Sequence, residues 1–223
     1  MLIRHRHIST YFVFVDMNFR PHGTRQWIEY RKGIHFHHHC RLHTDRLDYD
    51  SHHYKSDFCR LARVLTGQAI GIALGGGGAR GMSHLGVIKA MEECEVPIDM
   101  VGGTSIGAFI GGLYCIDDSY LSIIGRAHKY CNHMSSIWTY LLDVTLPVTS
   151  YFNGYGFCVG LKTAIGDVKI EDLWLPFFCV TTDLSTSKEK HHFNDTLWRY
   201  VRASMSLAGF LPPVCDVDPK VLY

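Results

Sequence analysis

The sequence predicts an α/β fold, a three-layer sandwich with a mostly parallel sheet that follows an irregular N-terminal extension. Short apolar runs alternate with segments in which apolar residues recur at helical spacing. Strands that alternate with helices form parallel sheets with helices on both faces. The 223 residues are 47% hydrophobic, which is enough for one substantial domain with a sizeable core.

The composition changes near Gly67. Residues 1–66 hold most of the 15 histidines and show little periodicity, whereas nearly all of the glycines and the long apolar stretches follow. We therefore predict an N-terminal extension over residues 1–66, with one short amphipathic helix at 57–65, and a main domain over 67–223. His35, His37, His38, His39 and Cys40 invite a metal site, but contiguous histidines point apart, so we predict a solvated loop and no metal.

The elements of the main domain follow in order from residue 70. Short apolar runs, typical of buried parallel strands, occupy residues 70–74, 98–101 and 177–181. Helical spacing occurs up to about residue 94 and over residues 106–115 and 197–207. A turn rich in glycine joins each of the first two strands to the helix that follows it.

The second of these turns carries a nucleophile motif, G-x-S-x-G, with Ser105 at its centre. A strand that turns at once into a helix strains the backbone of the central residue, so glycine is needed on both sides. The helix N-terminus favours negative charge that develops at the serine. Ser105 is the candidate nucleophile, within an elbow formed by Gly103, Thr104, Ile106 and Gly107. A tight turn with a capping serine is the alternative.

The first turn can supply the oxyanion hole that acyl transfer to a serine requires. Its glycines let backbone N–H groups approach a substrate closely, and the candidate donors are Gly76, Gly77, Gly78, Ala79, Arg80 and Gly81. The same residues fit the dinucleotide-binding pattern G-x-G-x-x-G, which expects an acid at the end of the second strand. Asp99 lies at the beginning of that strand and not at its end, which argues against the dinucleotide alternative.

These motifs carry a family resemblance. GIALGGGGARGMSHLGVIKAMEECEVPIDMVGGTSIGAFIGGLY resembles the catalytic core of patatin-like phospholipases, above all the neuropathy target esterase group of lysophospholipases. LPVTSYFNGYGF, IEDLWLPFFCVTTDLS and LWRYVRASMSLAGFLPP fit the same group, so the resemblance covers roughly residues 55–215. It implies that 67–223 is a patatin-like catalytic domain in which Ser105 attacks a fatty-acyl ester and an aspartate acts as its base.

The resemblance also implies partners and a location. The expected substrate is a lysophospholipid or phospholipid at a membrane surface, on the cytoplasmic side of intracellular membranes such as the endoplasmic reticulum. No metal or organic cofactor is expected. A formal net charge of +1 argues against a nucleic-acid partner. No apolar run approaches the roughly 18–20 residues that would span a bilayer.

The sequence departs from the family pattern at the base. The family aspartate lies in D-G-G or D-G-A, and no aspartate here precedes a glycine. Asp216 and Asp218 are the remaining candidates near the expected position. A serine without a base is a poor nucleophile. We therefore expect a catalytic domain truncated at its C-terminus, and the alternative is a lipid-binding or regulatory fragment without catalysis.

Overall fold

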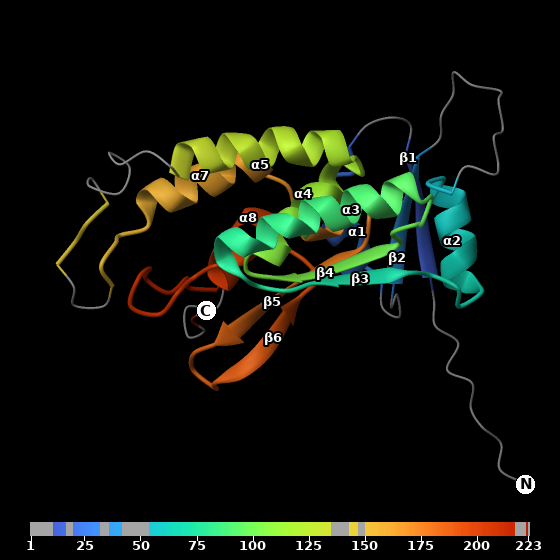
Figure 1. The fold of residues 1–223 in the computed structure, drawn as a ribbon. Helices are drawn as coiled ribbons and strands as arrows, with labels where there is room; N and C mark the ends of the chain where they lie inside the picture. The colour runs from blue at the N-terminus through green and yellow to red at the C-terminus, as the bar shows by residue number, and fades with distance from the viewer. Residues whose placement is uncertain are drawn as a thin grey trace, which may run out of the picture.

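The computed structural model describes residues 11–16, 20–31, 36–41, 54–134, 143–146, 150–216 and 222. It confirms an α/β fold with a mostly parallel sheet (Figure 1). The strands are β1 (Tyr11–Asp16), β2 (Phe36–Arg41), β3 (Gly71–Leu74), β4 (Met100–Thr104), β5 (Phe177–Asp183) and β6 (Lys188–His192). The helices are α1 (Thr24–Glu29), α2 (Asp57–Leu65), α3 (Ser83–Glu93), α4 (Ile106–Asp117), α5 (Tyr120–Met134), α7 (Tyr155–Ile165) and α8 (Leu197–Ser204), with 3₁₀ turns η1 (Gly78–Met82) and η2 (Ile170–Asp172).

The main sheet has the order β3-β4-β5-β6, in which β3, β4 and β5 are parallel and β6 is antiparallel to β5. Leu74 pairs with Gly103, and Thr104 pairs with Val180. The carboxyl ends of the three parallel strands therefore meet at one edge. The glycine-rich turn and Ser105 both follow directly from that edge.

Helix α4 forms the centre of the core and contacts β3, β4 and β5. Phe109, Ile110 and Leu113 are fully buried in it. A Cβ added at Gly111 would lie 2.7 Å from Val101 Cγ1, so this glycine lets the helix approach β4 closely. Apolar residues on nearly every side of a helix indicate complete burial, and the structure confirms it here.

The described helices α3, α4, α5, α7 and α8 all lie on one face of the main sheet (Figure 1). The opposite face presents Gly71, Ala73, Met100, Thr104 and Thr182, all exposed to solvent.

The histidine-rich stretch is a buried strand and not the solvated loop that its composition predicted. β2 pairs in parallel with β1 and buries His38, His39 and Cys40. His39 Nε2 lies 3.0 Å from the backbone oxygen of Glu171, which explains how a polar strand is satisfied in the interior. His35 lies outside the described residues. Among those described, no group of His, Cys, Asp or Glu is arranged to hold a metal.

Helix α2, at the bounds that the sequence predicted, joins this strand pair to the main domain. Asp57 accepts hydrogen bonds from Arg41 (2.7 Å) and Arg60 (2.6 Å), and Arg60 also donates to the Trp174 backbone oxygen at 3.1 Å. Burial alone would raise the pKa of Asp57, but these bonds and the two positive charges hold it below its usual value. The division at Gly67 stays a prediction.

Candidate functional site

Ser105 sits at the junction of β4 and α4 in a backbone conformation that non-glycine residues rarely adopt, with φ 53° and ψ −126°. A positive φ at such a residue costs of order 1–3 kcal/mol and is retained where the surroundings enforce it. The helix starts immediately, since Phe109 N donates to Ser105 O at 3.1 Å. The turn therefore presents the serine at the carboxyl edge of the sheet, at the N-terminus of α4.

The glycines of the motif are required by close contacts. A Cβ at Gly103 would lie 2.5 Å from Ala108 Cα, and a Cβ at Gly107 would lie 2.1 Å from Leu74 O. Both neighbours are backbone atoms that cannot move aside independently. The spacing of G-x-S-x-G thus follows from how tightly the first turn of α4 packs against β3 and β4.

The glycine-rich turn lies directly against the nucleophile elbow. A Cβ at Gly76 would be 3.3 Å from Ser105 Cβ, and one at Gly81 would be 2.0 Å from Ile106 Cγ2. The structure thus brings together two motifs that the sequence placed about 25 residues apart, as an oxyanion hole requires.

The turn is held in shape while several of its donors stay open. His84 Nε2 lies 2.9 Å from Gly75 O, and Arg80 N donates to Gly77 O at 3.2 Å. Gly78 has φ 54°, a conformation that favours glycine. In the part of the chain that the structure describes, the backbone N–H groups of Gly76, Gly77 and Gly78 have no acceptor. They are therefore available to a negatively charged oxygen, and Ala79 and Arg80 lie exposed beside them.

Ser204, which the sequence reasoning missed, bonds to the elbow. The Ser105 N–H donates to Ser204 Oγ at 2.7 Å, and Ser204 Oγ donates to Val180 O at 2.6 Å. One hydroxyl at the end of α8 thus connects Ser105 to Val180 in the middle of β5. A separation of 99 residues hides this contact from any local pattern.

A groove of about 660 Å³ opens beside this hydroxyl. It begins at Thr104 and Ser204 and extends along Val180 to Leu211 and Pro213. Its lining is mixed but includes much apolar surface, as a binding site for an amphiphile with an aliphatic chain requires.

The base remains unassigned. No described residue hydrogen-bonds to Ser105 Oγ. The carboxylate of Asp216 accepts a hydrogen bond from Tyr200 Oη at 3.0 Å and pairs with Lys190 at 3.5 Å. Asp218 lies outside the described residues. The role of either aspartate as the base stays a prediction.

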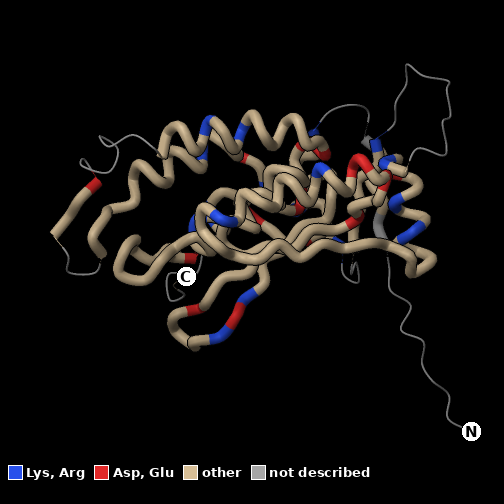
Figure 2. The backbone as a smooth tube through the Cα atoms, in the orientation of Figure 1, with Lys and Arg blue, Asp and Glu red and all other residues tan. Residues whose placement is uncertain are grey.

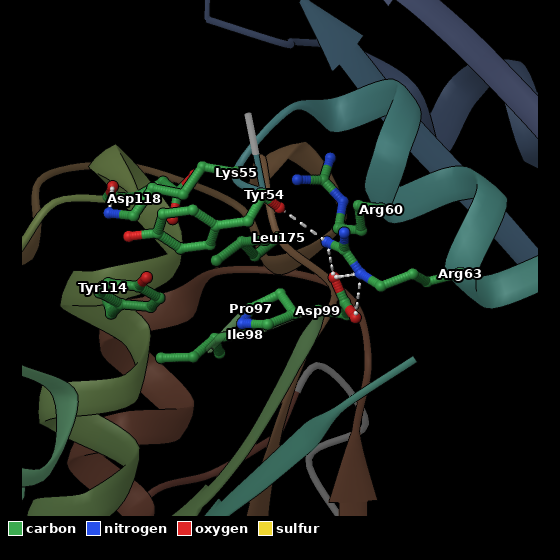
Figure 3. A pocket seen from close by; sticks show the side chains of 10 residues that line it. All are labelled: Tyr54, Lys55, Arg60, Arg63, Pro97, Ile98, Asp99, Tyr114, Asp118 and Leu175. Carbon is green, nitrogen blue, oxygen red and sulfur yellow. Dashed lines mark hydrogen bonds and ion pairs between the residues drawn. The ribbon is translucent and has the colours of Figure 1, made fainter. Parts of the chain in front are cut away.

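A second cavity lies at the opposite end of β4 and is only about 10 Å³, room for little more than a water molecule (Figure 3). At its wall Arg63 Nη2 pairs with Asp99 Oδ1 at 2.6 Å, and Ile70 N donates to Asp99 Oδ2 at 2.9 Å. Asp99 is 1% exposed and has no oxygen left for a ribose. The dinucleotide alternative therefore loses its acidic residue.

A comparison with family models matches residues 72–215 to the patatin-like phospholipases. The chain belongs to the patatin-like phospholipase family. The matched range includes the glycine-rich turn, the Ser105 elbow and Ser204.

Curated relatives agree with this membership. The chain is 56% identical over 169 residues to lysophospholipase nte1 of Emericella nidulans, covering 76% of this chain. It is 55% identical over 171 residues to lysophospholipase NTE1 of Candida glabrata and 54% identical over 163 residues to that of Saccharomyces cerevisiae, covering 77% and 73% of this chain. The chain spans only 10–11% of the length of these relatives. Among the described residues, no helix is long and apolar enough to cross a membrane.

Proposed function

We propose that this chain carries the nucleophile and the oxyanion hole of a lysophospholipase site, with Ser105 as the attacking residue. The strained elbow packed against open N–H donors of the glycine-rich turn carries this proposal. The high identity to relatives named lysophospholipases supports lysophospholipid as the substrate class.

The reaction follows from this arrangement. Ser105 Oγ attacks the ester carbonyl carbon and gives up its proton to a base, and the negative charge moves to the carbonyl oxygen. The N–H groups of Gly76, Gly77 and Gly78 stabilise that oxygen. The bond to the glycerol oxygen breaks as this oxygen takes a proton, leaving an acyl-enzyme. Water then attacks the acyl carbon, releasing the fatty acid and restoring the serine hydroxyl.

The base is the part of this mechanism that the described residues do not supply. The resemblance assigns the role to an aspartate in D-G-G or D-G-A, a motif absent from this sequence. A second candidate function is therefore lipid binding without turnover, favoured by the absence of a described partner for Ser105 Oγ.

Labelling with a fluorophosphonate, which reacts covalently with activated serines, separates the two functions. We expect the full chain to be labelled and Ser105→Ala to lose the label. Ser185→Ala, which removes an exposed serine from the turn after β5, should be labelled like the parent chain. A folded parent chain that takes no label would favour binding without catalysis, and label retained in Ser105→Ala would show that another residue is the nucleophile.

A further inference from the structure

Two uncharged segments lie together at the end of the molecule where the parallel strands end. Residues 144–161 and 203–215 contain no Lys, Arg, Asp or Glu. The first leads into α7 and the second follows from the end of α8 (Figure 1). In Figure 2 their described parts are drawn in tan, in contrast to the charged residues around β2 and α2.

The two segments are joined by backbone hydrogen bonds. Tyr151 N donates to Gly209 O at 2.9 Å, and Phe152 N donates to Phe210 O at 3.1 Å. The Phe152 and Phe210 rings lie 5.8 Å apart, and the Tyr151 and Phe210 rings 6.3 Å apart. The described parts of the two segments therefore form one surface, and backbone hydrogen bonds join them at Tyr151 and Phe152.

Buried charged groups hold this surface from beneath. The Asp143 carboxylate accepts hydrogen bonds from Gly154 N and Tyr155 N, both at 3.0 Å, at the start of α7. Arg202 donates to Pro212 O at 2.9 Å and to Ser206 Oγ. The charged side chains of Asp143 and Arg202 are thus buried, and the exposed side chains of the two segments are left uncharged.

We call the exposed side chains of these segments the apolar platform. It consists of five large residues, with the exposed fraction of each in parentheses: Leu146 (83%), Tyr155 (74%), Leu207 (61%), Tyr151 (59%) and Phe210 (50%). Exposed clusters of large apolar residues without charges mark interaction sites. Tyrosine, with an apolar ring and a polar tip, suits the boundary between water and lipid.

The platform is continuous with the groove at Ser204. Leu207, Phe210 and Leu211 line a hollow of about 260 Å³ on the platform, and Leu211 also lines the groove that begins at Thr104 and Ser204. An aliphatic chain that leaves a lipid layer at the platform can therefore pass Leu211 into the groove beside Ser204, whose hydroxyl accepts from the Ser105 N–H.

We propose that the apolar platform is the surface by which this chain rests on a phospholipid layer. This rests on the proposed function, because the groove is taken as the route of the acyl chain. An uncharged patch on a chain of formal net charge +1 attaches by insertion of apolar side chains and not by attraction to anionic headgroups. The attachment is therefore insensitive to salt.

The test is flotation of the full chain with phosphatidylcholine vesicles at low and at high salt. We expect the chain to float with the vesicles at both salt concentrations. The double variant Leu207→Ser, Phe210→Ser should lower the partition coefficient by about tenfold or more, given the apolar surface that it removes. Leu121→Ser, a matched change at an exposed leucine on α5, should float like the parent chain.

Several outcomes would overturn the proposal. These are a folded parent chain that stays off the vesicles, equal loss of flotation in Leu121→Ser, and flotation abolished by salt. A dimer of the parent chain in light scattering without lipid, lost in the double variant, would assign the platform to a second copy of the chain. The two proposals can be contradicted independently. Flotation without fluorophosphonate labelling contradicts catalysis but leaves the platform supported. Labelling without flotation contradicts the platform but leaves catalysis supported.

Discussion

At the scale of single residues, Ser204 contacts the backbone of Ser105, the proposed nucleophile, and not its side-chain oxygen. Its hydroxyl accepts from the Ser105 N–H at 2.7 Å and donates to Val180 O at 2.6 Å. Ser105 has φ 53°, so its backbone is held in a conformation that it would otherwise leave. The hydroxyl is therefore one of the contacts that keep the strained turn in place.

Replacing Ser204 should reduce both the stability of the chain and the reactivity of Ser105. Ser204→Ala leaves the part-buried Ser105 N–H without its acceptor, a cost of about 1–3 kcal/mol, and removes one donor from Val180 O. If the displaced turn loses about 1.4 kcal/mol of transition-state stabilisation, the rate of fluorophosphonate labelling falls about tenfold. Ser204→Thr, which keeps the hydroxyl, should restore most of the rate.

The control for this prediction is Thr66→Ala. It removes a hydroxyl that donates to Ala62 O at 2.9 Å on the exposed end of α2, far along the chain from the elbow. Its labelling rate should match that of the parent chain. If Ser204→Thr labels as slowly as Ser204→Ala, or if Ser204→Ala labels at the parent rate, the hydroxyl does not position the nucleophile.

At the scale of elements, the glycines divide into those that packing requires and those that merely interrupt a helix. Gly107 on α4 has Leu74 O at 2.1 Å from an added Cβ, whereas Gly86 on α3 and Gly125 on α5 have no atom within 4 Å. Glycine in a helix interior costs roughly 0.5–1 kcal/mol relative to alanine. These positions therefore have opposite expected responses to the same substitution.

Urea unfolding of three alanine variants tests this division. Gly86→Ala and Gly125→Ala should each raise the free energy of unfolding by about 0.5–1 kcal/mol. Gly107→Ala should lower it by about 1–3 kcal/mol or more, because overpacking must push α4 away from β3. A neutral Gly107→Ala would mean that the elbow is looser than these contacts indicate.

The same elements show what the sequence could predict. Local patterns were sufficient for α2, β3, α3 and α4, where apolar spacing and glycine-rich turns coincide. The second strand was predicted at 98–101 but occupies Met100–Thr104, since the glycines at its end lowered its apolar character. Helices α5 and α7 and strand β6 were not predicted, and the Ser204 contact depends on pairings across about 100 residues.

The burial of β2 was mispredicted for a related physical reason. Histidines look polar in sequence, yet His38 and His39 are both buried. His39 lies against the backbone oxygen of Glu171 and accepts from Arg60 at its own backbone oxygen, contacts that only the assembled fold supplies. The motif around Ser105 was recognisable because its glycines follow from local geometry. The burial of a polar side chain depends on partners that are distant in the sequence, so no local sequence pattern predicts it.

At the scale of the whole molecule, β2 and β6 each contain a histidine that is buried in its neutral form, His38 and His192. His192 on β6 lies 2.7 Å from Thr181 Oγ1 and stacks on Tyr200, with ring centroids 3.9 Å apart. Burial, reinforced by the charge of Lys190, lowers its pKa to about 4. Burial beside Arg60 likewise lowers the pKa of His38 to about 4. Both parts of the fold are therefore expected to weaken together in acid.

The two lowered pKa values predict how the free energy of unfolding depends on pH. Both histidines are mostly neutral in the folded and unfolded chain at pH 7, so most of their contribution to stability is present there. Below a pH of about 6.5 the unfolded chain takes up protons that the folded chain does not, so the free energy of unfolding falls until the pH reaches about 4.

Urea midpoints, measured between pH 7 and pH 4 for the parent chain and for His192→Gln, test this prediction. The variant should show a shallower decline, whereas His128→Gln, at an exposed position on α5, should keep the parent slope. Parallel curves for His192→Gln and the parent chain would mean that carboxylates alone drive the acid transition.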